Sequence, residues 1–300
     1  MTTRKKAPAA AAGNDGFSLI SNEKLLALYA AMLRSRMLTQ RIGRRRGGAA
    51  FGAGDEACVT GAVIDLRPHD AVSPPRGALT PCLLKGVPLK TIFTWVAAQP
   101  DALPARHAAR RIVAPGADLA AQLNAALGAA RRSRKAQDGG IVVVFGDCAQ
   151  LARGIGLDGL RAAAAERLPV LFVCRARAGK EDFGPKARDY GLPGMTVDGE
   201  DVVAVYRVVS EAIVHARRGN GPTLIECKPW TVASRKKSAR GGRDSVGNSD
   251  ALGNMEQYLS RKGLFRAEHK ADVEAEFELA MEKAAAAVGL SAGRKKSVRR

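Results

Sequence analysis

The sequence predicts an α/β protein in which helices flank a mostly parallel sheet. Three short apolar runs rich in β-branched residues are typical of strands buried on both faces of such a sheet. They are IVVVF (141–145), VLFVC (170–174) and TLIEC (223–227). Helical patterns at 157–167 and 201–217 separate the runs. Strand, helix and strand within residues 141–174 have the pattern of a βαβ unit, which is expected to be right-handed.

The N-terminal part of the chain predicts helices separated by glycine- and proline-rich turns. A tail over residues 1–16 precedes a helix that begins at Ser21 and continues, with apolar residues at three- and four-residue spacings, to the Arg- and Gly-rich stretch 41–54. Residues 72–77 cannot be helical, because their two prolines lack a backbone N–H and fix φ. The Pro-, Ala- and Arg-rich segment 98–116 fits no element. Three further helices are expected, at 55–64, 88–96 and 118–130.

The C-terminal part continues the alternation of strands and helices. A short strand at 195–197 comes before the 201–217 helix, and the charged, Ser- and Gly-rich stretch 231–250 is expected to be a mobile loop. An amphipathic helix is expected over 270–288. The chain therefore divides into a disordered tail (1–18), a single domain (19–290) and a basic tail (291–300).

Composition excludes several classes of protein. Apolar residues make up 46% and charged residues 26% of the 300 residues, which excludes a disordered chain, collagen and a small disulfide scaffold. No apolar run approaches the roughly 20 residues that cross a bilayer, so no membrane association is expected. The formal net charge is +19, which favours anionic partners such as phosphates, nucleic acid or an acidic protein. The alternative is that the basic runs are solvated loops and tails. These runs lie at 41–46, 131–135, 235–243 and 294–300.

The cysteines predict reduced thiols. Five cysteines are scattered along the chain with no Cys-x-x-Cys and no Cys/His spacing suited to zinc. Cys174 lies within an apolar run, where a reduced thiol behaves as a small hydrophobic residue. The odd number and the lack of a pattern indicate a reducing compartment, and the N-terminus has no long apolar stretch, so a cytoplasmic location is expected.

Asp147 is the first candidate site residue. It follows the 141–145 strand and comes directly after Gly146. Ligands bind beyond the carboxyl ends of the strands in open parallel sheets. A carboxylate there suits Mg²⁺ together with a bound diphosphate. The alternative is a turn or helix-cap residue, because many strands end in Gly-Asp for that reason.

Four stretches of the chain resemble a known family, the alpha subunits of the first component of the 2-oxoacid dehydrogenase complexes. The segment 25–43 matches the opening helix, and 52–72 matches a Gly-Gln-Glu-Ala segment in which Glu56 and Ala57 are kept. Residues 141–179 match a thiamine-diphosphate motif that starts Gly-Asp-Gly and ends in Asn-Asn, and 187–226 match the segment after it. The resemblance implies a single thiamine-diphosphate-binding-like domain.

The resemblance also implies a function and partners. It implies thiamine diphosphate and Mg²⁺ as cofactors, a small 2-oxoacid as substrate, a lipoyl disulfide as acceptor and a beta-like subunit as partner. Gly146, Asp147, Cys148 and Arg177 are the implied cofactor-binding residues, with Asp147 as the metal ligand. For Glu56 the family match implies a subunit contact or a place near the cofactor, and the alternative is an exposed helical acid. The four histidines are expected to be structural or exposed.

The chain departs from the family pattern at functional positions. Gly-Asp-Gly reads Gly146-Asp147-Cys148, and the terminal Asn-Asn falls at Ala176-Arg177. Arg177 therefore stands at the family's second Mg²⁺ ligand, although a guanidinium has no lone pair for a metal. Such an arginine could pair with Asp147 or hold a phosphate directly. The family's two histidine-bearing loops align with 76–79 and 234–245, which contain no histidine.

Three functional hypotheses follow from the sequence. The first is an alpha-like subunit that takes part in the oxidative decarboxylation of a 2-oxoacid. The second is a catalytically degenerate relative that keeps the fold for assembly or regulation, and the eroded motif motivates it. The third is a basic protein that associates with nucleic acid, but the chain has no recognition motif beyond its charge.

Overall fold

A computed structural model describes residues 20–43, 54–98, 107–113, 116–176, 182–229 and 250–290. Its centre is a five-stranded sheet of order β1-β2-β3-β5-β4 in which every pair of neighbours is parallel. The predicted α/β class with a parallel sheet is therefore confirmed. The strands are β1 (Ala71–Ser73), β2 (Val142–Asp147), β3 (Val170–Arg175), β4 (Gly194–Asp198) and β5 (Thr223–Lys228).

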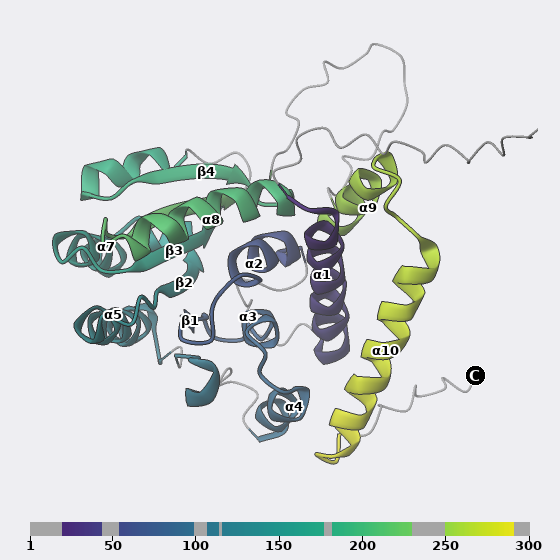
Figure 1. Cartoon of the computed structure of the whole chain (residues 1–300). Helices are drawn as coiled ribbons and strands as arrows, with labels where there is room; N and C mark the ends of the chain where they lie inside the picture. The colour runs from purple at the N-terminus through teal and green to yellow at the C-terminus, as the bar shows by residue number, and fades with distance from the viewer. Residues whose placement is uncertain are drawn as a thin grey trace, which may run out of the picture.

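Helices cover both faces of the sheet, as Figure 1 shows. On one face α2 (Glu56–Val63) packs against α8 (Val202–Arg217), and α8 lies against β3, β4 and β5. On the other face α5 (Leu119–Ala136) lies against β1 and β2 and contacts α7 (Ile155–Ala165). Alternate residues of each strand enter the two resulting cores, which explains the continuous apolar runs. Val143, Phe145 and Val173 belong to one core, and Val144, Phe172 and Cys174 belong to the other.

A third apolar cluster lies beyond the carboxyl ends of the strands. It joins α1 (Asn22–Ile42) to α9 (Ala251–Arg261) and α10 (Ala267–Ala286), with Tyr29 and Phe265 in edge-to-face contact. Ser21 caps α1 by accepting from the backbone N–H of Lys24, as the sequence predicts. In Figure 1 the purple helix α1 stands beside the yellow helix α10 on the side of the sheet to which the strands point.

The structure contains elements that the sequence pattern does not predict. Residues 71–73 form the edge strand β1 in front of the prolines, and Thr80–Leu84 forms the short helix α3. The helix expected over 118–130 continues to Ala136, and α9 has no counterpart in the prediction. The remaining helices are α4 (Leu89–Ala98), α6 (Cys148–Leu151) and the two 3₁₀ turns η1 (Ala108–Arg110) and η2 (Pro185–Tyr190).

The prediction of reduced, unpatterned thiols is wrong for two cysteines. Cys148 and Cys174 form a disulfide whose Cα atoms are 5.0 Å apart, and both side chains are buried. Cys58, Cys82 and Cys227 are free and buried. Sequence spacing does not predict the bond, because its partners are 26 residues apart and meet only when β2 and β3 pair.

Several sequence predictions concern residues outside the described ranges. They are the tails 1–18 and 291–300, the 231–250 loop, Arg177 and the basic runs at 235–243 and 294–300. Within the described ranges, no helix combines the length and the apolar character needed to cross a membrane.

Candidate functional site

Asp147 ends strand β2 at the carboxyl edge of the sheet. Its side chain is half-buried, and its Oδ1 accepts a hydrogen bond of 2.8 Å from the backbone N–H of Ala149. Asp147 is thus the N-cap of α6, which is the turn-and-cap role considered from the sequence. Gly146 and Cys148 flank it, so the three predicted residues form one turn at this edge. A carboxylate has a second oxygen, so capping does not use all its acceptor capacity.

Arg175 lies beside Asp147 on the neighbouring strand. The two residues are in register across the parallel β2–β3 pair, so their side chains leave the same face of the sheet. A terminal nitrogen (Nη1) of Arg175 lies 3.3 Å from Oδ2 of Asp55, a buried carboxylate at the N-terminus of α2. The planar guanidinium has further N–H groups that point in other directions. Sequence reasoning did not identify Arg175, because only the strand register shows that it stands next to the motif aspartate.

Glu56 is buried in a network of charges at the same edge, so the alternative of an exposed helical acid is wrong. Only 1% of the residue is exposed, and Arg36 donates to both of its carboxylate oxygens, at 3.0 and 3.1 Å. Arg36 also forms an ion pair of 2.6 Å with Asp250, the N-cap of α9. The network ties α1, α2 and α9 together.

The pair of Arg36 and Asp250 predicts a pH dependence of stability. The hydrogen bond from Arg36 lowers the pKa of Asp250 below its ordinary value. A lowered pKa in the folded state contributes stability above the unfolded-state pKa, and this stability is lost as the pH falls through the folded-state value. We expect Asp250→Asn, which keeps a capping side chain, to reduce the loss of stability between about pH 5 and pH 3.

The measurement is urea unfolding at several pH values in that range. The effect is expected to stay below about 1 kcal/mol, because the Asp250 side chain is 50% exposed to water. Asp158→Asn is the control, since Asp158 is exposed and pairs only within its own helix. If stability depends on pH equally in the parent chain and in Asp250→Asn, the ion pair of Arg36 and Asp250 is not the cause of the pH dependence.

The residues of this edge fit an anionic ligand better than a magnesium ion held by the protein. Asp147 is a single carboxylate, and Arg175 next to it is a cation that donates hydrogen bonds. Among the described residues, no three His, Cys, Asp or Glu side chains converge as metal ligands. Arg177 lies outside the described ranges, and as an arginine it adds no lone pair at the position of the second ligand. A diphosphate, in contrast, is the kind of group that guanidinium N–H donors bind.

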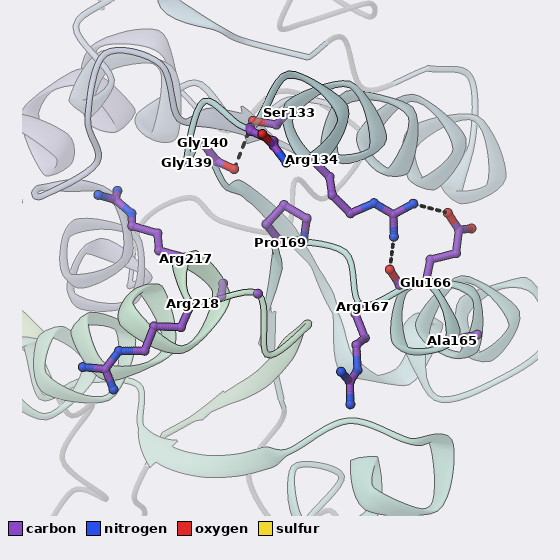
Figure 2. A pocket seen from close by; sticks show the side chains of 13 residues that line it. Ser133, Arg134, Gly139, Gly140, Ala165, Glu166, Arg167, Pro169, Arg217 and Arg218 are labelled. Carbon is purple, nitrogen blue, oxygen red and sulfur yellow. Dashed lines mark hydrogen bonds and ion pairs between the residues drawn. The ribbon is translucent and has the colours of Figure 1, made fainter.

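The hollow in Figure 2 lies at the opposite, amino edge of the sheet. It has a volume of about 740 Å³ and is lined by four arginines, including Arg167 and Arg218. The helices α5, α7 and α8 end there, so cations are favourable beside their C-terminal carbonyl groups. Figure 2 shows Arg134 turned towards Glu166, Arg167 extended downwards, and Arg217 and Arg218 extended to the left of the view. The arginines therefore surround the hollow without converging on a ligand.

The four histidines lie outside the turn that carries Asp147. His107 caps η1 through Nδ1, which accepts from the N–H of Arg110, and the His69 side chain is 38% exposed. His215 and His269 lie on α8 and α10, away from the turn at Asp147. None of the four follows the carboxyl end of a strand.

Comparison with known proteins shows the family of this chain. The chain matches the family model described as "Dehydrogenase E1 component" over residues 24–292. It is 29% identical over 242 residues, covering 72% of each chain, to the alpha subunit of acetoin:2,6-dichlorophenolindophenol oxidoreductase from Bacillus subtilis. It is 29% identical over 279 residues to the 2-oxoisovalerate dehydrogenase subunit alpha of the same organism, covering 82% of this chain and 84% of the relative.

A third relative extends the match over slightly more of the chain. The pyruvate dehydrogenase E1 component subunit alpha of Staphylococcus aureus is 26% identical over 284 residues, covering 85% of this chain and 75% of the relative. The matched range includes the whole described sheet and the residues around Asp147 and Arg175. The resemblance inferred from the sequence is confirmed: the chain belongs to the dehydrogenase E1 component family.

Proposed function

We propose that this chain is the alpha-like subunit of a thiamine-diphosphate-dependent 2-oxoacid dehydrogenase. Family membership supports the reaction class. The observation that carries the proposal is the strand register that sets Arg175 beside Asp147 at the carboxyl edge, where parallel sheets bind their ligands. The cofactor supplies a nucleophilic carbon for attack on the oxo group, and the protein binds and orients it.

The residues of the edge have distinct roles in this proposal. Arg175, oriented by buried Asp55, donates hydrogen bonds to the diphosphate. Gly146 and Cys148 flank Asp147 and form the turn that carries it, and Arg177 adds a second cation. A magnesium ion that arrives with the diphosphate would meet Asp147 at the end of β2, and among the described residues no cluster of three protein ligands.

The proposal includes partners and a location. A beta-like subunit completes the active site and supplies the acid that activates the cofactor, and a heterotetramer of alpha- and beta-like chains is the proposed assembly. The substrate is a small 2-oxoacid, the acceptor is a lipoyl disulfide, and the location is the cytoplasm. The 131–135 run contributes at most weak anion contacts, since Arg131 and Arg134 are paired with Glu166.

Replacing Arg175 tests the proposal directly. We expect Arg175→Gln to weaken thiamine diphosphate binding about tenfold or more, because a hydrogen bond to a charged group contributes roughly 1.5–3 kcal/mol. The measurement is titration calorimetry with thiamine diphosphate and Mg²⁺, on the chain alone and with a co-expressed beta-like partner. Thermal unfolding of each variant reports any loss of fold, since Arg175 also contacts buried Asp55.

One control and one further variant separate the possible results. Arg207→Gln removes an exposed arginine on α8 and should leave binding unchanged. Asp147→Ala should also weaken binding, through loss of the cap that orders the turn. If the parent binds and Arg175→Gln binds equally well, the site is placed wrongly. No heat with millimolar cofactor, with and without the partner, rejects the function itself.

The alternative is a non-catalytic relative that keeps the fold for assembly or regulation. The chemistry of the edge motivates it, because Arg175 stands beside Asp147 and no three ligand side chains of the described residues converge on a divalent ion. The same calorimetry separates the two functions, since the degenerate relative is expected to give no heat of cofactor binding, either alone or with the beta-like partner.

A further inference from the structure

The disulfide joins the turn that carries Asp147 to the neighbouring strand. Cys148 is the first residue of α6, and Cys174 is the residue of β3 in register with Gly146. The bond therefore links Cys148, which follows Asp147, to the β3 residue that stands beside Gly146, which precedes Asp147. The Cys148–Cys174 bond lies in the core between the sheet and α5 and α7, while Asp147 points to the other face.

The other contacts of this turn are non-covalent: the β2–β3 ladder ends at Asp147, and α6 packs against α7 and the sheet. The Oδ1 atom of Asp147 accepts from the N–H of Ala149 inside the turn, so this hydrogen bond shapes the turn without attaching it to β3. Leu151, which is fully buried, packs close to Gly146 at the end of the four-residue helix α6. A helix of this length has little stability of its own. The ladder between β2 and β3 holds the chain as far as Asp147, and the covalent link to β3 restrains Cys148 and the short helix that begins there.

We propose that Cys148 and Cys174 are a redox-modification site, and that their thiol–disulfide state sets the order of the turn 146–149. The oxidant is a small-molecule disulfide such as glutathione disulfide. The Cys148 thiolate, the more exposed of the two, attacks it and forms a mixed disulfide while one thiol leaves. The Cys174 thiolate then displaces the second thiol and closes the bond. Two protein thiols lose two electrons and two protons, and the external disulfide becomes two thiols.

All five cysteines are buried, and the other three differ from Cys148 and Cys174 in that they are not bonded to a cysteine. Cys58 and Cys227 contact each other on the opposite face of the sheet and remain thiols in the structure. Burial raises the pKa of the Cys58 thiol well above its ordinary value, so little reactive thiolate forms. Burial likewise raises the pKa of Cys82, which has no cysteine partner in the structure. These three thiols are internal controls for the reactive pair.

The proposal is tested on the full chain in buffers of reduced and oxidised glutathione. Differential alkylation after denaturation, followed by mass spectrometry, identifies the cysteines that are oxidised, because all five are buried in the folded chain. Hydrogen exchange of the peptide over 146–152 measures the order of the turn. We expect Cys148 and Cys174 alone to become protected from alkylation, and reduction to speed exchange over 148–151 about tenfold. Cys174→Ala should give the faster exchange in both buffers, and Cys82→Ala should behave like the parent.

The link to cofactor affinity rests on the proposed function, whereas the thiol chemistry and the exchange do not. If the function holds, reduction should weaken thiamine diphosphate binding about fivefold, because the ordered turn is then only partly populated. All five cysteines alkylating after oxidation, or equal exchange in both redox states, would overturn the proposal. A redox-dependent turn that binds no cofactor in either state would support the proposal and reject the proposed function.

Discussion

Replacing Asp70 with alanine is expected to lower the free energy of unfolding by about 3–5 kcal/mol, the cost typical of breaking a buried ion pair from one side. The Asp70 side chain is fully buried just before β1. It accepts from the N–H of Ile141 at 3.0 Å, from the N–H of Arg67 at 2.6 Å and from the guanidinium of Arg217 at 2.6 Å. These contacts join the starts of β1 and β2 to the end of α8, so alanine leaves three donors without their acceptor.

The measurement is urea unfolding followed by circular dichroism. Asp70→Asn should lose less stability, because its amide oxygen can still accept from a backbone N–H while the charge is lost. Asp158→Ala removes a carboxylate that is 65% exposed and should change stability by less than about 0.5 kcal/mol. An Asp70→Ala chain within about 1 kcal/mol of the parent would show that solvent replaces the carboxylate at this turn.

Most of the sheet could be predicted from the sequence because its strands are buried on both faces. Runs such as 141–145 and 170–174 must be apolar at every position when both sides pack against helices. The edge strand β1 was missed because three residues carry too little pattern, and it forms through pairing with β2. The α9 helix was missed although Leu252, Met255 and Leu259 recur at helical spacing, because it directly follows the charged, Ser- and Gly-rich stretch expected to be a loop.

The candidate site could be predicted only as far as local sequence determines it. Gly146 and Asp147 follow directly from a strand that ends, and the structure has them at the carboxyl edge. Arg175 becomes a neighbour of Asp147 through the register of two strands that are joined by a crossover of variable length. For Glu56 the alternative of an exposed acid stayed open beside the role implied by the family, because its burial depends on Arg36 from another helix. Contacts between distant segments are set by tertiary packing, and a single sequence does not contain that information in its periodicity.

Replacing Glu226 with alanine is expected to have an effect of similar size, about 3–5 kcal/mol, on the free energy of unfolding. Glu226 lies inside β5 with 1% of its surface exposed. Its Oε2 accepts from the backbone N–H groups of Phe183 and Gly184 and from the hydroxyl of Thr196, each at 2.8 Å. Each hydrogen bond to a charged acceptor contributes roughly 1.5–3 kcal/mol, and alanine leaves two buried N–H groups unsatisfied.

The comparison with Glu226→Gln isolates the cause of that loss. Glutamine has the same shape and retains one oxygen that accepts from the three donors, so it should cost clearly less than alanine. Hydrogen exchange over 183–190 adds a local measurement, because Phe183 and Gly184 lead into η2 and Glu226 is what attaches them to the sheet. Faster exchange there in Glu226→Ala, with β2 and β3 unchanged, would show that this carboxylate determines where the chain returns to the sheet after β3. Equal stability of the alanine and glutamine variants would contradict this, because it would mean that the volume of the side chain matters and its oxygen does not.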